Sequence, residues 1–273
     1  MTSQWQRLLK NTGTWQGSFT RLSPQGQVLT DTPSEVLLEP YDDNQAMRQI
    51  VCRWPAAQPV QEQTLDYRSV SRATLFCENG AFSYGSMQWS PFSEFGAELG
   101  LIDRDRRLRL VQLFEKGQQL QSITLIREVL KGTDPPEIPP LQLEELLGTW
   151  QGEAVTVYPD LSPDSSQATM LTIERVSDRE IQQTLEFDSG APIRSVGQVE
   201  GNRIRFEVGS QPIQVLLLSY GASSTCPTQI QPRQPLFLEA GWRLEPGRRQ
   251  RLIRRYDASG AWSSLTLVTE QKV

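Results

Sequence analysis

The chain contains one sequence twice, and this repeat restricts its fold more than any other feature. Residues 13–17, Gly-Thr-Trp-Gln-Gly, return at mid-chain as residues 148–152 with the same five letters. The ends of the two halves match as well, because Ser-Ile-Thr-Leu-Ile-Arg-Glu at 122–128 corresponds to Ser-Leu-Thr-Leu-Val-Thr-Glu at 264–270. Since the two matches have nearly the same separation and bracket both halves, we expect a tandem of one domain.

A proline-rich segment separates the two halves. Residues 132–140 contain four prolines, which lack a backbone donor and favour extended conformations. We therefore expect one domain at 1–131, a linker at 132–140 and a second domain at 141–273. Leucines at helical spacing just ahead of each Gly-Thr-Trp predict a short helix at the start of each domain.

The remaining pattern indicates an all-β chain. Short runs of β-branched and aromatic residues alternate with Gly, Pro, Asp and Asn, at about one run per ten residues. No segment looks like an amphipathic helix that could cross over between parallel strands, so we expect antiparallel neighbours in sequence order. The expected fold class is two tandem antiparallel up-and-down β-barrels, each preceded by a short helix.

Charge and apolar content exclude several classes of partner. The net charge is -5, with 37% hydrophobic and 22% charged residues, which fits a soluble globular protein and favours no nucleic acid. No run approaches the ~18 apolar residues of a membrane span, and the start lacks the pattern of a secretory signal. Three cysteines at unpatterned spacing indicate reduced thiols, so we expect a cytoplasmic or plastid-stroma protein. The sequence gives no signal for an oligomeric state.

The chain has no histidine. Imidazole is required by Ser-His-Asp and Cys-His nucleophile systems, by ordinary zinc sites and by histidine-ligated haem. We therefore expect no metal site and no cofactor held by such ligands. Acid–base chemistry would fall to carboxylates, lysines, tyrosines or thiols.

Each half opens with a short helical segment and Gly-x-Trp, followed by expected up-and-down strands. This pattern resembles the calycins, the barrels of lipocalins and fatty-acid-binding proteins. The resemblance implies that Trp15 and Trp150 plug one end of their barrels and that an arginine on the last strand covers the tryptophan. Arg127 matches that arginine in the first half, whereas Thr269 stands at the position in the second.

Over its whole length the chain resembles a cyanobacterial and plastid family of tandem calycins, the domain of unknown function 3598. The resemblance is clearest in residues 13–26, 91–101 and 214–218. It implies a fold and a photosynthetic setting, but no activity.

A second resemblance, to the S-type phycobiliprotein (bilin) lyases, points toward chemistry. These single-barrel enzymes carry Glu-x-x-Trp followed by an arginine-bearing strand. Here Glu98 and Arg109 match that pattern in the first half, and Glu239 and Arg251 match it in the second. Leu101 replaces the tryptophan of the first copy. The resemblance implies a bilin ligand, a phycobiliprotein subunit as partner, and a lyase or isomerase in which Glu98 and Arg109 orient the bilin.

The same two pairs point to a ligand site on physical grounds. Alternate residues of a barrel strand face inward, so a glutamate and an arginine on adjacent strands could share the interior. The arginine would bind a ligand carboxylate through two hydrogen bonds, and the glutamate a pyrrole N–H. The alternative is an ordinary cross-strand ion pair on an outer face.

Residues 82–95 mix aromatic and polar side chains, which suits a pocket or the core and rim of a small barrel. The second half lacks most of these aromatics, so we expect the better pocket in the first half. An arginine-rich run at 243–255 is interpreted as a solvated face, with contact to a phosphate or an acidic protein as the alternative. The residues expected to contact a ligand are Arg21, Tyr84, Trp89, Phe92, Glu94, Glu98, Arg107, Arg109, Glu239, Trp242 and Arg251.

Three hypotheses follow for function. The first is a binding module for a hydrophobic or tetrapyrrole-like small molecule. The second is the chromophore lyase or isomerase. The third is a non-catalytic scaffold or assembly factor whose barrels are filled by side chains.

Overall fold

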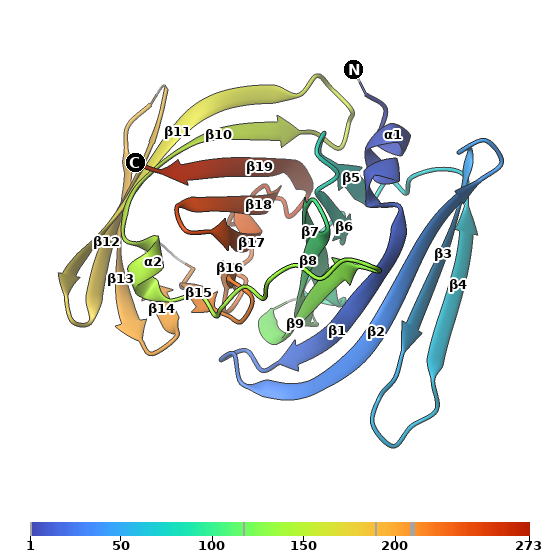
Figure 1. Ribbon diagram of the computed structural model, residues 1–273. Coiled ribbons are helices and arrows are strands. Elements are labelled where there is room, and N and C mark those ends of the chain that lie inside the picture. Colours follow the sequence, from blue (N-terminus) through green and yellow to red (C-terminus); the bar gives the residue numbers. More distant parts are fainter. Residues whose placement is uncertain (1, 117, 189, 208–210) are drawn as a thin grey trace.

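The computed structural model describes residues 2–116, 118–188, 190–207 and 211–273. These residues form nineteen strands, two short α-helices and one 3-10 turn, η1 (Leu9–Asn11). The all-β, tandem calycin-like arrangement expected from the sequence is confirmed, and a short helix precedes each repeated Gly-Thr-Trp (Figure 1). None of the described helices is long and apolar enough to cross a membrane.

The first half forms a curled sheet that stays open. Its nine antiparallel strands run in the order β4-β3-β2-β1-β9-β8-β7-β6-β5, and β4 and β5 are its free edges. We therefore correct the expectation of a closed first barrel. The elements are α1 (Gln4–Leu8), β1 (Gly13–Leu22), β2 (Val28–Tyr41), β3 (Ala46–Arg53), β4 (Gln61–Tyr67), β5 (Thr74–Phe76), β6 (Phe82–Gly85), β7 (Phe95–Asp103), β8 (Arg106–Glu115) and β9 (Gln119–Leu130).

The second half forms a closed barrel of ten strands in sequence order, in which β10 pairs with β19. The elements are α2 (Leu143–Leu146), β10 (Gly148–Val157), β11 (Ser165–Ser177), β12 (Glu180–Phe187), β13 (Ile193–Glu200), β14 (Arg203–Phe206), β15 (Ile213–Leu217), β16 (Ala222–Pro227), β17 (Leu236–Glu245), β18 (Arg248–Tyr256) and β19 (Trp262–Lys272).

The glycines of the repeated motif have a structural reason in both halves. Gly13 and Gly148, which begin β1 and β10, have φ values of +125° and +107°, a region that favours glycine. Gly17 and Gly152 lie where the first strand touches the last one. A Cβ at Gly17 would lie 1.7 Å from the carbonyl oxygen of Arg127, and one at Gly152 2.7 Å from that of Thr269. Gly-Thr-Trp-Gln-Gly therefore marks the place where the first strand of each half pairs with its last strand.

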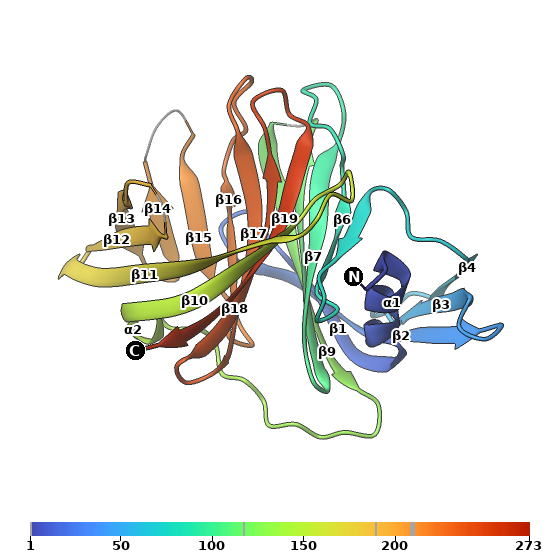
Figure 2. The same cartoon turned by 90° about the horizontal axis from the view of Figure 1, so that it is seen from above.

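The two halves share one continuous hydrophobic core. The outer faces of β7 and β8 pack against the outer faces of β16, β17 and β18 (Figure 2). Leu99, Leu101 and Leu108 on one side and Leu238 and Leu252 on the other are all fully buried in this cluster. The inner face of the second barrel therefore points away from this shared core.

The proline-rich segment follows the boundary between the two sheets instead of hanging free. Ile138 is buried in the shared core, the N–H of Gly221 donates to Pro139 O at 2.9 Å, and Arg106 donates to Pro136 O at 2.7 Å. We retain 1–131 and 141–273 as proposed domains, with the qualification that their cores are fused.

Candidate functional site

Each half builds a buried ionic cluster around its repeated tryptophan. Arg107 and Arg109 on β8 both donate to Glu128 on β9, at 2.7 Å from Arg107 Nε and 2.9 Å from Arg109 Nη2. Arg109 Nη1 also donates to Glu98 on β7 at 2.8 Å. The Arg107 guanidinium lies 4.6 Å from the ring centroid of Trp15. The first ionic cluster consists of Trp15, Glu98, Arg107, Arg109 and Glu128.

The second half repeats this arrangement residue for residue. Arg249 Nε and Arg251 Nη2 on β18 donate to Glu270 on β19 at 2.6 Å and 2.8 Å. Arg251 Nη1 lies 3.3 Å from Glu239 on β17, and the Arg249 guanidinium lies 4.2 Å from the Trp150 ring centroid. The second ionic cluster consists of Trp150, Glu239, Arg249, Arg251 and Glu270.

The predicted Glu–Arg pairs are therefore real cross-strand ion pairs. They do not lie on an outer, solvated face, because Glu239 and Arg251 both line the interior of the second barrel. In the first half Arg109 uses all three of its nitrogens on Glu98 and Glu128. This geometry leaves no nitrogen of Arg109 without a carboxylate partner, which disfavours a role in orienting a bilin.

The central carboxylates of both clusters stay ionised. Burial alone raises the pKa of a carboxyl group, but two neighbouring guanidiniums outweigh it and lower the pKa of Glu128 and Glu270 to about 2. Burial likewise opposes the charge of Arg109 and Arg251, yet two carboxylates each raise their pKa. Glu128 and Glu270 therefore hold strands together and do not serve as general acids at neutral pH.

The arginine that covers Trp15 is Arg107 and not Arg127. Adjacent residues of a strand point to opposite faces, and Glu128 faces the cluster, so Arg127 points to the other side of the sheet. There it donates to Ser18 Oγ at 2.9 Å and to Thr20 Oγ1 at 3.1 Å. In the second half Arg249 covers Trp150, so no arginine is needed at position 269, where the chain has threonine.

The two central glutamates were not among the predicted site residues, although the sequence contains a signal for them. Glu128 and Glu270 are the shared last letters of the repeated closing segments. Arg107 and Arg109 recur as Arg249 and Arg251 with the same single-residue spacing, which places both guanidiniums of a pair on one face of a strand.

The second barrel encloses a cavity of about 740 Å³. Strands β11–β15 supply a mostly apolar wall, and β16–β19 supply a wall rich in polar and charged side chains. The apolar wall includes Leu171, Ile173, Ile181, Ile204, Phe206 and Val215. The polar wall includes Ser223, Thr225, Glu239, Arg251, Arg255 and Thr266.

The barrel is hollow because its polar wall carries short side chains or long ones that are tied back to the wall. Gly241, Ser223 and Thr225 take little space, and a Cβ at Gly241 would already lie 2.3 Å from Ser223 Oγ. Hydrogen bonds to Glu239 on β17 and Glu270 on β19 hold Arg251 to its neighbouring strands. An interior lined this way leaves room that larger apolar residues would fill.

The cavity of about 740 Å³ lies in the second half, whereas the better pocket was expected in the first. The segment at 82–95 does not contribute to the lining of this cavity. Trp89 is buried in the shared core, and its backbone N–H donates to Gly260 O at 2.7 Å. Phe92 is 92% exposed, and Glu94 beside it is exposed as well.

The remaining predicted ligand residues fall into different places. Tyr84 is 54% exposed and pairs with Glu98 across β6 and β7, on the open concave face of the first sheet. Arg21 is exposed near the end of β1. Trp242 belongs to the cavity wall, but its ring stacks on Tyr220 at 5.9 Å within the shared core.

The arginine-rich run at 243–255 is not a solvated face. Arg243, Arg249, Arg251 and Arg255 line the cavity. Arg254, on the opposite face of β18, is fully buried against the first half, where it donates to the carbonyl oxygens of Gly85 and Ser86 and lies 3.4 Å from the Trp262 ring centroid.

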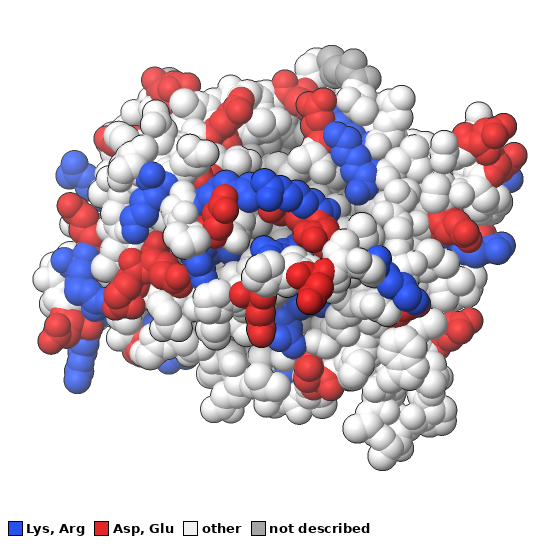
Figure 3. Space-filling view, in the orientation of Figure 1, with Lys and Arg blue, Asp and Glu red and all other residues white. Residues whose placement is uncertain are grey.

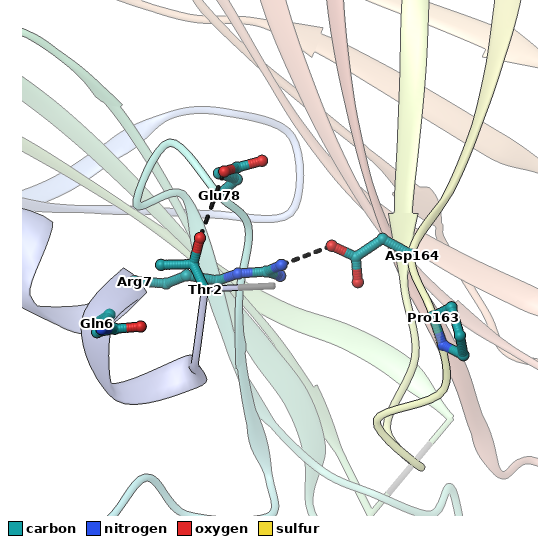
Figure 4. A pocket seen from close by; sticks show the side chains of 6 residues that line it. All are labelled: Thr2, Gln6, Arg7, Glu78, Pro163 and Asp164. Carbon is teal, nitrogen blue, oxygen red and sulfur yellow. Dashed lines mark hydrogen bonds and ion pairs between the residues drawn. The ribbon is translucent and has the colours of Figure 1, made fainter.

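A second, polar cleft of about 610 Å³ lies where α1 meets the loop after β10 (Figure 4). Arg7 crosses it to reach Asp164, with 2.6 Å between Nη2 and Oδ2. Thr2 Oγ1 lies 3.4 Å from Glu78 on the same side. The cleft is another contact between the halves, and five of its six lining residues, all but Pro163, are polar or charged.

Charged side chains of both signs alternate over the face shown in Figure 3, with no large area of one sign. In the described part of the chain, no group of three or more Cys, Asp or Glu side chains is placed to hold a metal ion. The cavity of the second barrel is thus the candidate site.

Comparison with known proteins gives a family relationship. Residues 1–133 match the N-terminal domain of the domain of unknown function 3598 (DUF3598), and residues 137–273 match the domain described as biogenesis factor required for ATP synthase 1, C-terminal domain. A DUF3598 protein of unknown function from Nostoc punctiforme is 45% identical, with full coverage of both chains and a TM-score of 0.94.

A more distant structural match is the S-type phycobiliprotein lyase from Guillardia theta. It is 14% identical, covers 48% of this chain and 89% of the lyase, and has a TM-score of 0.40. No curated protein matches the chain at a significant level.

Proposed function

Because the chain belongs to the DUF3598 family, whose related structure has no assigned function, we propose a function from the site itself. The second barrel binds a small molecule with a hydrophobic or tetrapyrrole-like body. The protein acts as a binding module in a photosynthetic cell.

One observation supports this proposal above the others, namely the hollow interior of the closed barrel. Its volume of about 740 Å³ lies within the ~300–1,000 Å³ of small-molecule sites. An apolar wall opposite a wall of placed polar groups is the usual lining of such sites. A barrel serving only as a scaffold would gain stability from filling this space with side chains.

The direct test is a binding titration of the full chain with a panel of bilins, carotenoids, chlorophyll precursors and fatty acids. Trp150 lies under Arg249 of the cavity wall, so a bound pigment should quench tryptophan fluorescence, and a bound bilin should shift its own absorbance to the red. We expect at least one class to bind with one molecule per chain.

A matched pair of variants assigns the binding to the barrel interior. Val215→Trp fills the cavity from β15, whereas Val196→Trp adds the same ring on the outer face of β13. We expect Val215→Trp to abolish binding and Val196→Trp to retain it, with thermal melts showing that both fold. Failure of every ligand class, or equal binding by both variants, would contradict the proposal.

A second candidate function rests on the match over residues 137–273. A domain of that type is described as part of a biogenesis factor required for ATP synthase. We therefore also propose that the chain is an assembly factor for an ATP synthase. The sequence-based form of this hypothesis expected filled barrels, and the hollow second barrel contradicts that part of it.

The assembly hypothesis is tested with purified subunits of the ATP synthase. The full chain should bind isolated subunits or partial complexes and should dissociate once the enzyme is fully assembled. Cells without the chain should contain less assembled ATP synthase on native gels. Normal assembly together with no subunit binding would exclude this role.

We also propose a reducing compartment, the cytoplasm or the plastid stroma, for this activity. Cys52, Cys77 and Cys226 are free thiols, and burial raises the pKa of Cys77 and Cys226 to about 12, which keeps them protonated and unreactive.

A further inference from the structure

The four arginines that line the cavity differ in how their charges are balanced. Arg249 and Arg251 are bound to Glu270, and Arg251 also to Glu239. Arg243 Nε lies 3.2 Å from Glu145 Oε1. Arg255, by contrast, forms no side-chain hydrogen bond or ion pair with the described residues. Among the four arginines that line the cavity, Arg255 is therefore the one whose guanidinium has no bonded carboxylate among the described residues.

Arg255 lies at the open end of the cavity. Residues 249, 251, 253 and 255 of β18 face inward in turn, and Arg249 lies against Trp150 near the end that α2 approaches. Six residues of extended strand separate Arg255 from Arg249 and place it about 20 Å farther along. There it pairs with Phe237 on β17 and Ser264 on β19, and it is exposed.

The surroundings of Arg255 favour an incoming anion. Partial desolvation by the barrel wall lowers the pKa of Arg255, although the residue is exposed at the mouth, and Glu239 acts on it only through space. Glu239 is itself bound to Arg251. A carboxylate from a ligand would supply the counterion that the protein does not, through the bidentate geometry that guanidinium and carboxylate share.

The opposite wall restricts what can accompany that carboxylate. Leu171, Ile204, Phe206 and Val215 supply an apolar surface to the same cavity that Arg251 and Arg255 line. A small polar acid would leave this surface in contact with water, and a purely apolar molecule would leave the arginine without a counterion. Only a ligand with both features satisfies both walls.

We propose that the second barrel selects ligands that carry a carboxylate on an apolar body, and that Arg255 binds the carboxylate at the mouth. The apolar body then lies along β11–β15. This inference rests on the proposed binding function of the same cavity and adds the ligand class and the residue that determines it.

The test compares an acid with its ester in the full chain. Dodecanoate and methyl dodecanoate share one apolar body, and each is titrated against the neutral dye Nile red. We expect dodecanoate to displace the dye at roughly a ten- to hundredfold lower concentration than the ester, because charge-assisted hydrogen bonds are the stronger ones. Arg255→Gln should remove that difference.

A matched control is Arg194→Gln, since Arg194 is an exposed arginine on the outer face of β13. It should keep the preference for the acid. Equal displacement by acid and ester in the unmodified chain, or a preference that survives Arg255→Gln, would refute the claim that Arg255 binds the carboxylate. Either result would leave the proposed binding function intact. Failure of both compounds to displace the dye, or of the dye to bind at all, contradicts the binding function as well.

Discussion

At the scale of single residues, two buried glutamates connect sequence repeat to structure. Glu128 and Glu270 are fully buried, and each balances two arginines on the neighbouring strand. Breaking a buried pair by removing one partner is costly because the other charge stays buried without compensation. These carboxylates therefore matter more to stability than any exposed ion pair of the molecule.

Replacing Glu270 by Gln should destabilise the protein by about 3–5 kcal/mol, since Arg249 and Arg251 would keep buried charges without their shared carboxylate. Glu128→Gln should have a similar effect. Urea denaturation followed by circular dichroism measures both. Glu200→Gln, which removes an exposed pair with Arg203, should leave the midpoint unchanged. A Glu270→Gln midpoint as high as that control would refute the role given to the cluster.

The same carboxylates predict a pH dependence of stability. Their pKa falls from 4.5 to about 2 on folding, so the unfolded chain binds protons that the folded chain does not. Their contribution is complete above pH 4.5 and is lost as the pH falls toward 2. The stability difference between the unmodified protein and Glu270→Gln should therefore shrink over that interval. A difference that stays constant down to about pH 2 would show that Glu270 is not held ionised by its arginines.

At the scale of elements, the repeated motif acts where the first strand meets the last one of each half. The close approach at Gly17 is tighter than that at Gly152, because a Cβ would meet the opposing carbonyl oxygen at 1.7 Å instead of 2.7 Å. The two copies therefore serve as controls for each other. Because the strands approach more closely at Gly17, we expect this glycine to matter more to stability than Gly152.

Gly17→Ala should push β1 away from β9 and lower the free energy of unfolding by at least about 1–3 kcal/mol, the usual cost of overpacking. Gly152→Ala should cost less, since its Cβ would lie 2.7 Å from the nearest backbone atom, Thr269 O, instead of 1.7 Å. Parallel denaturation curves of the two variants measure the difference. A larger destabilisation by Gly152→Ala than by Gly17→Ala would show that the distance between the paired strands does not determine the cost of the added Cβ.

The fold could be predicted from sequence at this scale because its signals are local. Gly-Thr-Trp-Gln-Gly, the turn residues and the leucines before each motif all act within a few residues of themselves. The cavity could not be located because a barrel interior depends on closure and on strand register, and a shift of one residue exchanges the two faces. Arg127 and Arg107 show this directly, because the resemblance assigned the cover to a residue that points to the opposite face.

At the scale of the whole molecule, the two halves of the tandem sequence pack around one shared hydrophobic core. Arg254 contributes to this union, since it is fully buried and donates to backbone carbonyls of the first half from a strand of the second. The outer faces that a free barrel would present to water are the shared core here. The open first sheet and the hollow second barrel therefore depend on each other for stability.

The two halves should accordingly unfold in one cooperative step. Urea curves from tryptophan fluorescence and from far-ultraviolet circular dichroism should coincide. Arg254→Ala should shift that single transition to lower urea, because it leaves a void and several carbonyls without their donor. Two separate transitions in the unmodified protein would show that 1–131 and 141–273 are independently stable.

The central claim is that the second barrel is a ligand cavity, and an anomalous-scattering map tests it most directly. Crystals grown with 12-bromododecanoate should place the bromine inside the barrel, near the apolar wall of Leu171, Ile204 and Phe206, with the carboxylate at Arg255. Bromine density confined to the open face of the first sheet or to the surface, with the barrel holding only water, would contradict the account.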